Sequence, residues 1–461
     1  SVLRQEGAFE PRQRAAIHHA GLAGRSRTLV DALVRSCGPN PRSLRRLGNL
    51  CPSVTLAQSG QSESLPARLC EGEIHVRTAA ASTGLGDARE AGRRLAQDIS
   101  QGLGEEPKAL MVFAAPSYDH KSLLDELAQR CPGALVVGAS SAGEFMNQER
   151  GEGLACALGL AGDDVRFAAG LARDIKEDPA AAAQEMVSSF HGLTDYAFPY
   201  RSALVMADAL AGHADVLVDE LTLATGGQYQ FFGGGAGDNA QFQRTSVFCG
   251  REVLNGAAVA LEMLTEKPIG VGVRHGWTTA SAPYRVTEAD GMRLISLNGM
   301  PAAEAFEAHA ASTGQELDRA APIPFFLHNI VGIEAGDSHR LRVPLAILPD
   351  GSVLCAAEVP QGSVIHIMRV SAASAVDAAQ DATQAALAAM GEHKPQAALF
   401  FDCVATRLRM GDQFGEEVAI VRDQLAGADL LGCNTHGQIA RAEGQFEGFH
   451  NCTAVVAILP A

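Results

Sequence analysis

Short runs of consecutive apolar residues alternate with amphipathic segments through most of this chain. The first clear run, KALMVFA at 108–114, is followed by a helical pattern at 122–130 and a second run, ALVV, at 134–137. Runs of four to seven apolar residues are too short for a buried helix and are typical of strands covered on both faces. A further run at 154–160 completes the order strand, helix, strand, strand.

The last part of the chain repeats this order. An apolar run at 397–401 precedes a helical pattern at 416–425, a second run at 428–431 and a closing run at 454–459. Two distant segments with the same series of elements indicate an internal duplication. The chain is therefore predicted to be an α/β (α+β) protein with two related halves, each a mixed β-sheet flanked by helices.

A glycine-rich turn follows the second strand in both halves. The segments GASSAGEF at 138–145 and GCNTHGQI at 432–439 share the pattern G-x-[SN]-[ST]-x-G-[EQ]. The matched pairs are Gly138 with Gly432, Ser140 with Asn434, Ser141 with Thr435, Gly143 with Gly437, and Glu144 with Gln438. A looser copy, one residue shorter, ends in GGGAGD at 233–238 and suggests a third relative between the halves.

The boundary between the two halves is expected after residue 297. Residues 268–297 have extended patterns and an Ala-Asp-Gly turn, which is typical of antiparallel strands. Asn298 fits a helix N-cap, and Pro301 fits the first turn of the helix that follows. We therefore expect one domain at 77–297 and a second at 298–461.

Residues 1–76 differ in composition from the rest of the chain. They contain ten arginines, no lysine and six acidic residues, a net charge of +4; the whole chain carries −16, so the remainder carries −20. Arg, Ser, Gly and Pro dominate the second half of this segment, and apolar periodicity is weak. We expect a poorly structured leader, either a basic regulatory tail or non-native upstream sequence.

Composition argues against several classes of function. An acidic chain repels phosphate backbones, and with 5% aromatic residues and one tryptophan, Trp277, it lacks platforms for stacked bases. No stretch approaches the ~18 apolar residues that span a membrane. The ten cysteines occur without a C-x-x-C pair, which is typical of reduced intracellular thiols. We expect a cytoplasmic protein that binds neither nucleic acid nor membrane.

Small residues at the strand ends indicate a ligand site. They let a ligand approach the backbone and offer N–H and O–H groups at the edge of a sheet. Related loops on related halves should face each other across one cleft, with Glu144 and Gln438 as its strongest polar groups. The alternative is that the glycines only form tight turns. Arg407 and Arg409 follow the segment FFDC, where one of them either clamps a ligand carboxylate or remains a solvated surface arginine.

The sequence does not complete any of three well-defined motifs for nucleotide binding or catalysis. No lysine follows Gly138 as in a P-loop, GGGAGD lacks the last glycine of a dinucleotide fingerprint, and Ala142 replaces the second glycine of a nucleophile elbow. The 14 histidines are scattered, which argues against a structural zinc. Cys403 or Cys433 with His436 remains an alternative nucleophilic site. Such cysteines are more often small core residues, and we expect no enzyme.

At these residues the chain resembles the FIST family of bacterial signal-transduction sensors. The matching segments, VVGASSAGEF, FFGGGAGD, GVRHGWT, LNGMPAAEAF, FFDCVATRLR, LLGCNTHGQI and FHNCTAVVAIL, together cover residues 77–461. The resemblance implies a small ligand, amino acids among those proposed, and a separate signalling partner such as a histidine kinase or a cyclic-di-GMP enzyme. The residues then expected to bind the ligand are Gly138, Ser140, Ser141, Glu144, Gly234, Asp238, Cys403, Arg407, Asn434, Thr435, His436, Gln438 and Asn451.

Some members of this family are haem-binding nitric-oxide sensors. The family motif T-Y-G-E reads T-H-G-Q here, at residues 435–438. The change removes a carboxylate that an amino-acid ligand would need and adds an imidazole. The resemblance therefore makes His436 the candidate axial ligand of a haem, with His275 and His450 as rivals.

Overall fold

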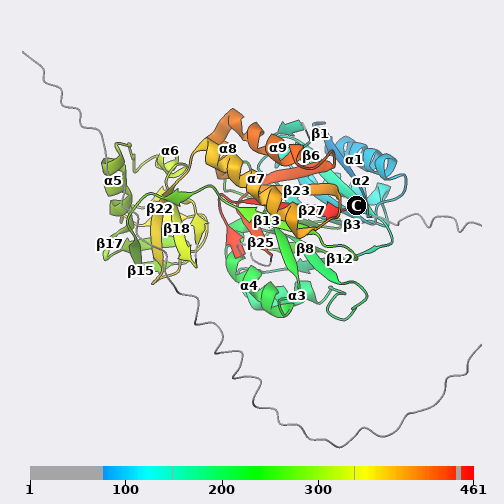
Figure 1. The fold of residues 1–461 in the computed structure, drawn as a ribbon, viewed down its shortest axis with the longest axis horizontal. Coiled ribbons are helices and arrows are strands. Elements are labelled where there is room, and N and C mark those ends of the chain that lie inside the picture. Colours follow the sequence, from blue (N-terminus) through cyan, green and yellow to red (C-terminus); the bar gives the residue numbers. More distant parts are fainter. Residues whose placement is uncertain (1–75, 148, 337, 443–447) are drawn as a thin grey trace, which may run out of the picture. The chain divides into compact units, whose positions relative to one another are not determined.

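The computed structural model describes residues 76–461, except 148, 337 and 443–447 (Figure 1). The expected leader, residues 1–76, lies outside the described residues apart from Val76. The described residues form three consecutive units with the same order of elements, and a fourth sheet is inserted into the third unit. No helix in this part of the chain has the length and apolar character needed to cross a membrane.

The first unit comprises a strand and a helix, two parallel strands joined by a helix, a hairpin and a closing strand. Its elements are β1 (Arg77–Thr83), α1 (Ala88–Leu103), β2 (Ala109–Ala114), α2 (His120–Arg130), β3 (Leu135–Ser140), β4 (Glu144–Met146), β5 (Glu149–Gly151) and β6 (Ala155–Ala161). Asp87 and Asp119 cap the two helices, because each side chain accepts a backbone N–H of the first turn.

The second unit repeats this order. Its elements are β7 (Val165–Ala172), α3 (Pro179–Val187), β8 (Tyr200–Ala207), the short 3-10 helix η1 (Ala209–Ala211), α4 (Ala214–Ala224), β9 (Gln230–Gly235), β10 (Val247–Cys249), β11 (Glu252–Leu254) and β12 (Ala258–Thr265). The strands β8 and β9 are parallel, as β2 and β3 are in the first unit.

The third unit has the same plan, interrupted after its first strand. Its elements are β13 (Gly270–Arg274), α7 (Ala372–Ala389), β23 (Pro395–Cys403), α8 (Val404–Met410), the short 3-10 helix η2 (Gly411–Gln413), α9 (Phe414–Asp423), β24 (Asp429–Thr435), β25 (Gln438–Arg441), β26 (Gly448–His450) and β27 (Ala454–Pro460). Again the two central strands, β23 and β24, are parallel.

The three units exchange hairpins in a closed ring. Their sheets have the orders β1-β6-β2-β3-β10-β11, β7-β12-β8-β9-β25-β26 and β13-β27-β23-β24-β4-β5. In each sheet one unit supplies the first four strands and another unit supplies the last two. The register is equivalent in all three, with the pairs Glu144–Cys433, Gln438–Gly234 and Val247–Ala139. The body therefore has a pseudo-threefold organisation.

The predicted α/β class and the internal duplication are confirmed, and the looser third copy is a full repeat. The acidic residue that ends this copy, Asp238, lies in a longer loop between β9 and β10, and Val247 occupies the register position of Glu144. Residues 236–246 separate β9 from β10, whereas only residues 141–143 separate β3 from β4, so the third copy diverges within and after its glycines.

The consecutive apolar runs of the strands follow from burial on both faces. In β2, Met111 and Phe113 lie in a central core that strands of all three sheets share, whereas Leu110 and Val112 pack under α1 and α2. The first motif glycine of each unit permits close approach of the parallel neighbour. An added Cβ would lie far inside van der Waals distance of a carbonyl oxygen: 1.8 Å for Gly138 to Val112, 2.1 Å for Gly233 to Val205, and 2.2 Å for Gly432 to Phe400.

The fourth sheet occupies residues 278–369, and its elements gather in one part of Figure 1. They are β14 (Thr278–Thr279), β15 (Tyr284–Asp290), β16 (Arg293–Leu297), β17 (Met300–Pro301), α5 (Ala302–Thr313), α6 (Ile323–Phe326), β18 (Ile330–Ala335), β19 (Ser338–Arg342), β20 (Pro344–Ile347), β21 (Val353–Cys355) and β22 (Val364–Arg369). The predicted N-cap is wrong: Asn298 has a φ of 51° in the β16–β17 turn and accepts the Arg285 N–H at 2.8 Å.

Candidate functional site

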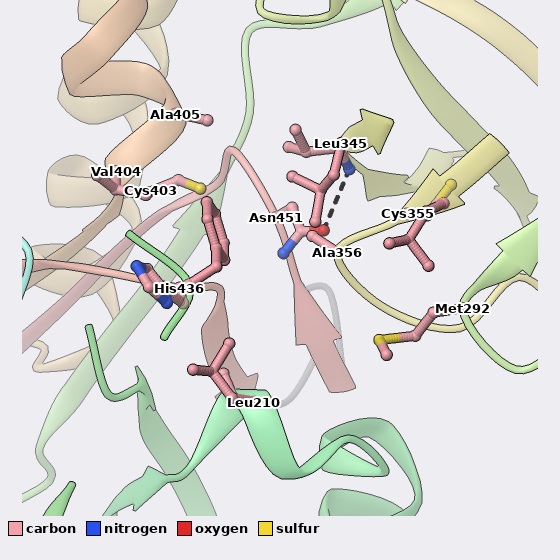
Figure 2. Close-up of a pocket in the computed structure, with 14 residues that line it drawn as sticks. Leu210, Met292, Leu345, Cys355, Ala356, Cys403, Val404, Ala405, His436 and Asn451 are labelled. Atoms are coloured by element: carbon pink, nitrogen blue, oxygen red, sulfur yellow. Dashed lines mark hydrogen bonds between the residues drawn. The ribbon is translucent and has the colours of Figure 1, made fainter. Parts of the chain in front are cut away.

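Three cavities among the described residues border the motif-bearing loops; one of them, of about 430 Å³, contains Asp238 as its single predicted residue, and the other two contain three predicted residues each. The first of these two, the apolar pocket, has a volume of about 200 Å³. Its walls come from the second unit, the third unit and the fourth sheet (Figure 2). The lining residues are Ala209, Leu210, Phe242, Met292, Val343, Leu345, Leu354, Cys355, Ala356, Cys403, Val404, Ala405, His436 and Asn451. Of the residues predicted from the sequence, Cys403, His436 and Asn451 therefore lie together here.

Asn451 joins the third unit to the fourth sheet at the edge of this pocket. Its Oδ1 accepts the Val343 backbone N–H at 3.2 Å, the bond drawn dashed in Figure 2. Its Nδ2 donates to the His450 carbonyl at 3.3 Å. Because both ends of this amide are hydrogen-bonded, Asn451 positions the pocket walls.

His436 lines the apolar pocket and has one ring nitrogen without a hydrogen-bond partner among the described residues. Its ring stacks on Phe242, with centroids 4.6 Å apart, and Nε2 lies 3.4 Å from Asp238 Oδ1. Among the described residues Nδ1 has no hydrogen-bond partner. Burial lowers the pKa of His436 to about 4, against the opposing effects of Asp238 and Asp208, so the imidazole is neutral at pH 7.

The thiols of the predicted alternative enzyme site do not pair with this imidazole. Burial raises the pKa of Cys433 well above its usual value, and Cys433 lies inside β24. A hydrogen bond with Cys452 lowers the pKa of Cys403. However, Nε2 of His436 faces Asp238, and Nδ1 has no partner in the described part of the chain. A thiol hydrogen-bonded to its general base, the usual geometry of such a site, is therefore absent from these residues.

The second cavity, the polar pocket, has a volume of about 460 Å³ and lies between the β4–β5 hairpin and the segment that follows β23. Its lining residues are Glu144, Phe145, Arg150, Gly151, Glu152, Arg407, Leu408, Gly411, Asp412, Phe414 and Asn434. Three of the predicted ligand-binding residues, Glu144, Arg407 and Asn434, come together here. Arg407 pairs with Glu152 through Nη1.

Glu144 lies at the inner wall of the polar pocket with both carboxyl oxygens hydrogen-bonded. Ser141 Oγ donates to Oε1 at 2.5 Å, and the Leu154 N–H donates to Oε2 at 2.9 Å. Burial raises the pKa of this carboxyl to about 7, although these bonds and the Arg407 charge favour the ionised form. Glu144 can therefore hold or release a proton near neutral pH.

The remaining predicted residues of the two motifs form the packed junction of the three units. Gln438 donates to Thr435 Oγ1 at 2.8 Å and accepts the Thr453 N–H at 3.2 Å, and it lines neither pocket. Ser140 accepts the Ser246 N–H. Backbone bonds of 2.8 Å join the three loops pairwise: Ala142 N–H to Asn434 O, Gly235 N–H to Gly437 O, and Gly237 N–H to Ser140 O. The motif loops therefore meet, and Glu144 and Asn434 share the polar pocket. They do not form the expected single cleft with Gln438 in it, because Gln438 lines neither pocket and His436 lines the apolar one.

Other predicted residues have structural roles at or near the same junction. An added Cβ on Gly234 would lie 2.7 Å from the Gly437 carbonyl oxygen, so this glycine permits close strand packing. Asp238 accepts the N–H groups of Phe242, Gln243 and Arg244 and thereby shapes the long loop. Neither of the rival haem ligands, His275 and His450, lines the apolar pocket.

Sequence reasoning missed the contribution of the fourth sheet. Met292, Leu345 and Cys355 enter the apolar pocket from an insertion with no counterpart in the repeat pattern. It also missed the buried carboxyls of Asp402 and Glu417, which lie close enough to titrate as a pair. Burial raises the pKa of both, most strongly that of Glu417. No local signal marks these residues, because they meet only when α9 packs beside the end of β23.

The comparisons with known proteins agree with this arrangement of motifs. A model of the FIST N domain matches residues 108–300, and a model of the FIST C domain matches residues 302–441. The chain belongs to the FIST family. The predicted resemblance is confirmed, and FIST domains are sensory domains of signal transduction.

No curated protein matches this FIST sequence. Among solved structures, cyanuric acid hydrolase from A. caulinodans is 9% identical, with 84% of this chain and 99% of that chain covered and a TM-score of 0.29. PurLQS from Thermotoga maritima is 11% identical, with 84% and 74% covered and a TM-score of 0.21. Both scores are too low to support an argument. Among the described residues of this FIST protein, no three His, Cys, Asp or Glu side chains gather as a metal site.

Proposed function

We propose that this FIST protein senses a small, largely uncharged ligand in the apolar pocket and passes the signal to a separate partner protein in the cytoplasm. A histidine kinase or a cyclic-di-GMP enzyme would be such a partner. The observation that carries the proposal is the pocket itself: an apolar cavity walled by three substructures, with one unpartnered imidazole nitrogen in its wall.

The position of the pocket supports a role in sensing. Met292 and Leu345 belong to the fourth sheet, whereas Leu210 and His436 belong to the repeat body (Figure 2). A ligand that fills the pocket touches both at once. It therefore favours whichever arrangement of the sheet against the body gives the better contacts, and such differential binding is what shifts a conformational equilibrium.

The lining also defines the chemistry of the ligand. Leu210, Leu345 and Leu354 offer apolar contacts. Nε2 of His436 accepts the Asp238 backbone N–H at 3.5 Å and lies 3.4 Å from Asp238 Oδ1, so Nδ1 donates a hydrogen bond in one tautomer and accepts one in the other. We infer an apolar ligand that carries one hydrogen-bonding group for Nδ1 of His436.

A thermal-shift experiment with indole, an uncharged aromatic with one N–H donor, tests this proposal. Saturating indole should raise the melting temperature by a few degrees, because a ligand that binds only the native state stabilises it. Ala356→Phe should abolish the shift by filling the pocket, whereas Ala321→Phe, at an exposed position outside it, should not. An equal shift in wild type and Ala356→Phe would contradict the proposal, as would no shift in wild type.

Haem is the second candidate ligand, and the unpartnered Nδ1 of His436 favours it. The neutral imidazole is the form that binds iron, and the walls of the pocket are apolar. The cavity of about 200 Å³ is smaller than a porphyrin, so haem binding would require the fourth sheet to move away from the repeat body. His436 would hold the haem, which would itself supply the position where nitric oxide binds.

Addition of haem to the purified protein tests this candidate. A Soret band should form with wild type and with His393→Ala, at an exposed histidine, but should be weak with His436→Ala. No band with wild type rejects haem. An unchanged band and affinity with His436→Ala rejects His436 as its ligand.

A further inference from the structure

The polar pocket contains two hydrogen-bond donors without partners. Asn434 is 1% exposed, and within the described residues neither its Nδ2 nor Nε of Arg407 has a hydrogen-bond partner. Both residues line the cavity. An unsatisfied buried donor is costly, and native proteins retain few of them, so two in one cavity indicate a missing acceptor.

Gly143 keeps open the space beside the Asn434 amide and the Arg407 side chain. A Cβ at this position would lie 2.9 Å from Asn434 Oδ1 and 3.3 Å from Arg407 Nε, so one point is close to both side chains. Gly143 has a φ of 123°, a conformation that residues with side chains rarely adopt. The turn therefore forms a cradle that a side chain would fill.

The remaining lining of the polar pocket is partly apolar. Phe145 and Phe414 pack edge to face at 5.9 Å, and Leu408 is 46% exposed although it is a large apolar residue. A ligand for this pocket should combine an acceptor for the two donors with an apolar body for these side chains.

We propose that the polar pocket binds a small carboxylate with an apolar body. The carboxylate accepts hydrogen bonds from Arg407 and Asn434, since a guanidinium edge matches a carboxylate in shape and charge. Without ligand, Glu152 pairs with Arg407, but the Glu152 side chain is 62% exposed and is the group that the ligand displaces. The site is independent of the apolar pocket and of the function proposed for it.

Calorimetric titration of the full chain with benzoate tests this site. Arg407→Gln should weaken binding tenfold or more, because it removes a charge-assisted hydrogen bond. Glu152→Gln should strengthen binding several-fold, because it removes the competing carboxylate. Arg422→Gln and Glu416→Gln are matched controls at surface positions on α9 outside the pocket, and they should change the affinity less than twofold. Benzamide, the neutral counterpart of benzoate, should bind at least tenfold more weakly.

Asn434→Asp keeps the size of the side chain and replaces the donor by an anion, so it should also weaken benzoate binding at least tenfold. Because Glu152 is exposed, Glu152→Gln remains informative even if the substitutions at Arg407 or Asn434 impair folding. No binding of benzoate to wild type would overturn the proposal. Equal binding by wild type, Arg407→Gln and Glu152→Gln would overturn it as well. Indole binding in the apolar pocket should be unchanged by Glu152→Gln, which separates failure of this site from failure of the proposed function.

Discussion

Glu144 and Gln438 occupy matching positions of two repeats, yet their surroundings differ. The Gln438 amide is bonded at both ends inside the junction of the units, whereas Glu144 borders a cavity. Burial disfavours the charged form of the Glu144 carboxyl, and this raises its pKa to about 7. The same sequence position therefore serves packing in one repeat and carries a titratable group in another.

Glu144→Gln should remove a pH dependence of stability. The folded protein binds the Glu144 proton more tightly than the unfolded chain, whose value is 4.5, so stability decreases as the pH rises from about 4.5 to about 7. A shift of this size corresponds to about 3 kcal/mol. Gln mimics the protonated carboxyl and should lack this loss.

Urea unfolding of wild type and Glu144→Gln at pH 5 and pH 8 measures the difference. The two free energies should diverge with rising pH in favour of the variant. A constant difference across this range would show that Glu144 titrates normally in the folded state.

At the scale of elements, a buried ion pair attaches the fourth sheet to the repeat body. Arg342, at the end of β19, pairs with Asp215 in the first turn of α4 and donates to the Phe449 carbonyl at 3.0 Å. Asp215 in turn accepts the Phe449 N–H at 2.9 Å. The guanidinium is fully buried, so its charge depends on this partner.

Arg342→Met should destabilise the protein by about 3 kcal/mol, because it leaves the Asp215 carboxylate partly uncompensated. Nη1 of Arg340 lies 3.7 Å from Asp215 Oδ2, and its charge limits the loss of stability. Adding Asp215→Asn should recover part of the stability, since it removes the charge and keeps an acceptor for Phe449. Chemical denaturation of the single and double variants measures this, and a double variant less stable than Arg342→Met would contradict the interpretation.

At the scale of the whole molecule, hairpin exchange explains why the pockets lie where they do. Each motif turn leads a hairpin out of its own unit and into the sheet of another, so each cavity is walled by more than one unit. The helix α8 connects the two pockets, because Val404 and Ala405 line the apolar pocket and Arg407 and Leu408 line the polar one. A ligand in either pocket therefore contacts the same short helix.

The elements and their repetition follow from the amino-acid sequence alone. The apolar runs and the glycine turns reflect local requirements. A strand buried on both faces needs apolar side chains, and a position where two strands approach closely needs glycine. The same local signals placed Glu144, Arg407 and Asn434 among the candidate ligand residues. The longer loop that contains Asp238 could not be recognised from this pattern, because its additional residues follow the last glycine of the motif.

The pairing of strands and the grouping of side chains around a cavity depend on long-range packing. The hairpin strands β4 and β10 are three residues long and pair with strands of other units, so their partners depend on the register of distant segments. His436 stacks on Phe242 and shares a cavity with Met292 only because a loop of the second unit and an inserted sheet pack against the third unit. Such contacts arise from packing between segments far apart in the chain, and no local pattern of residues encodes them.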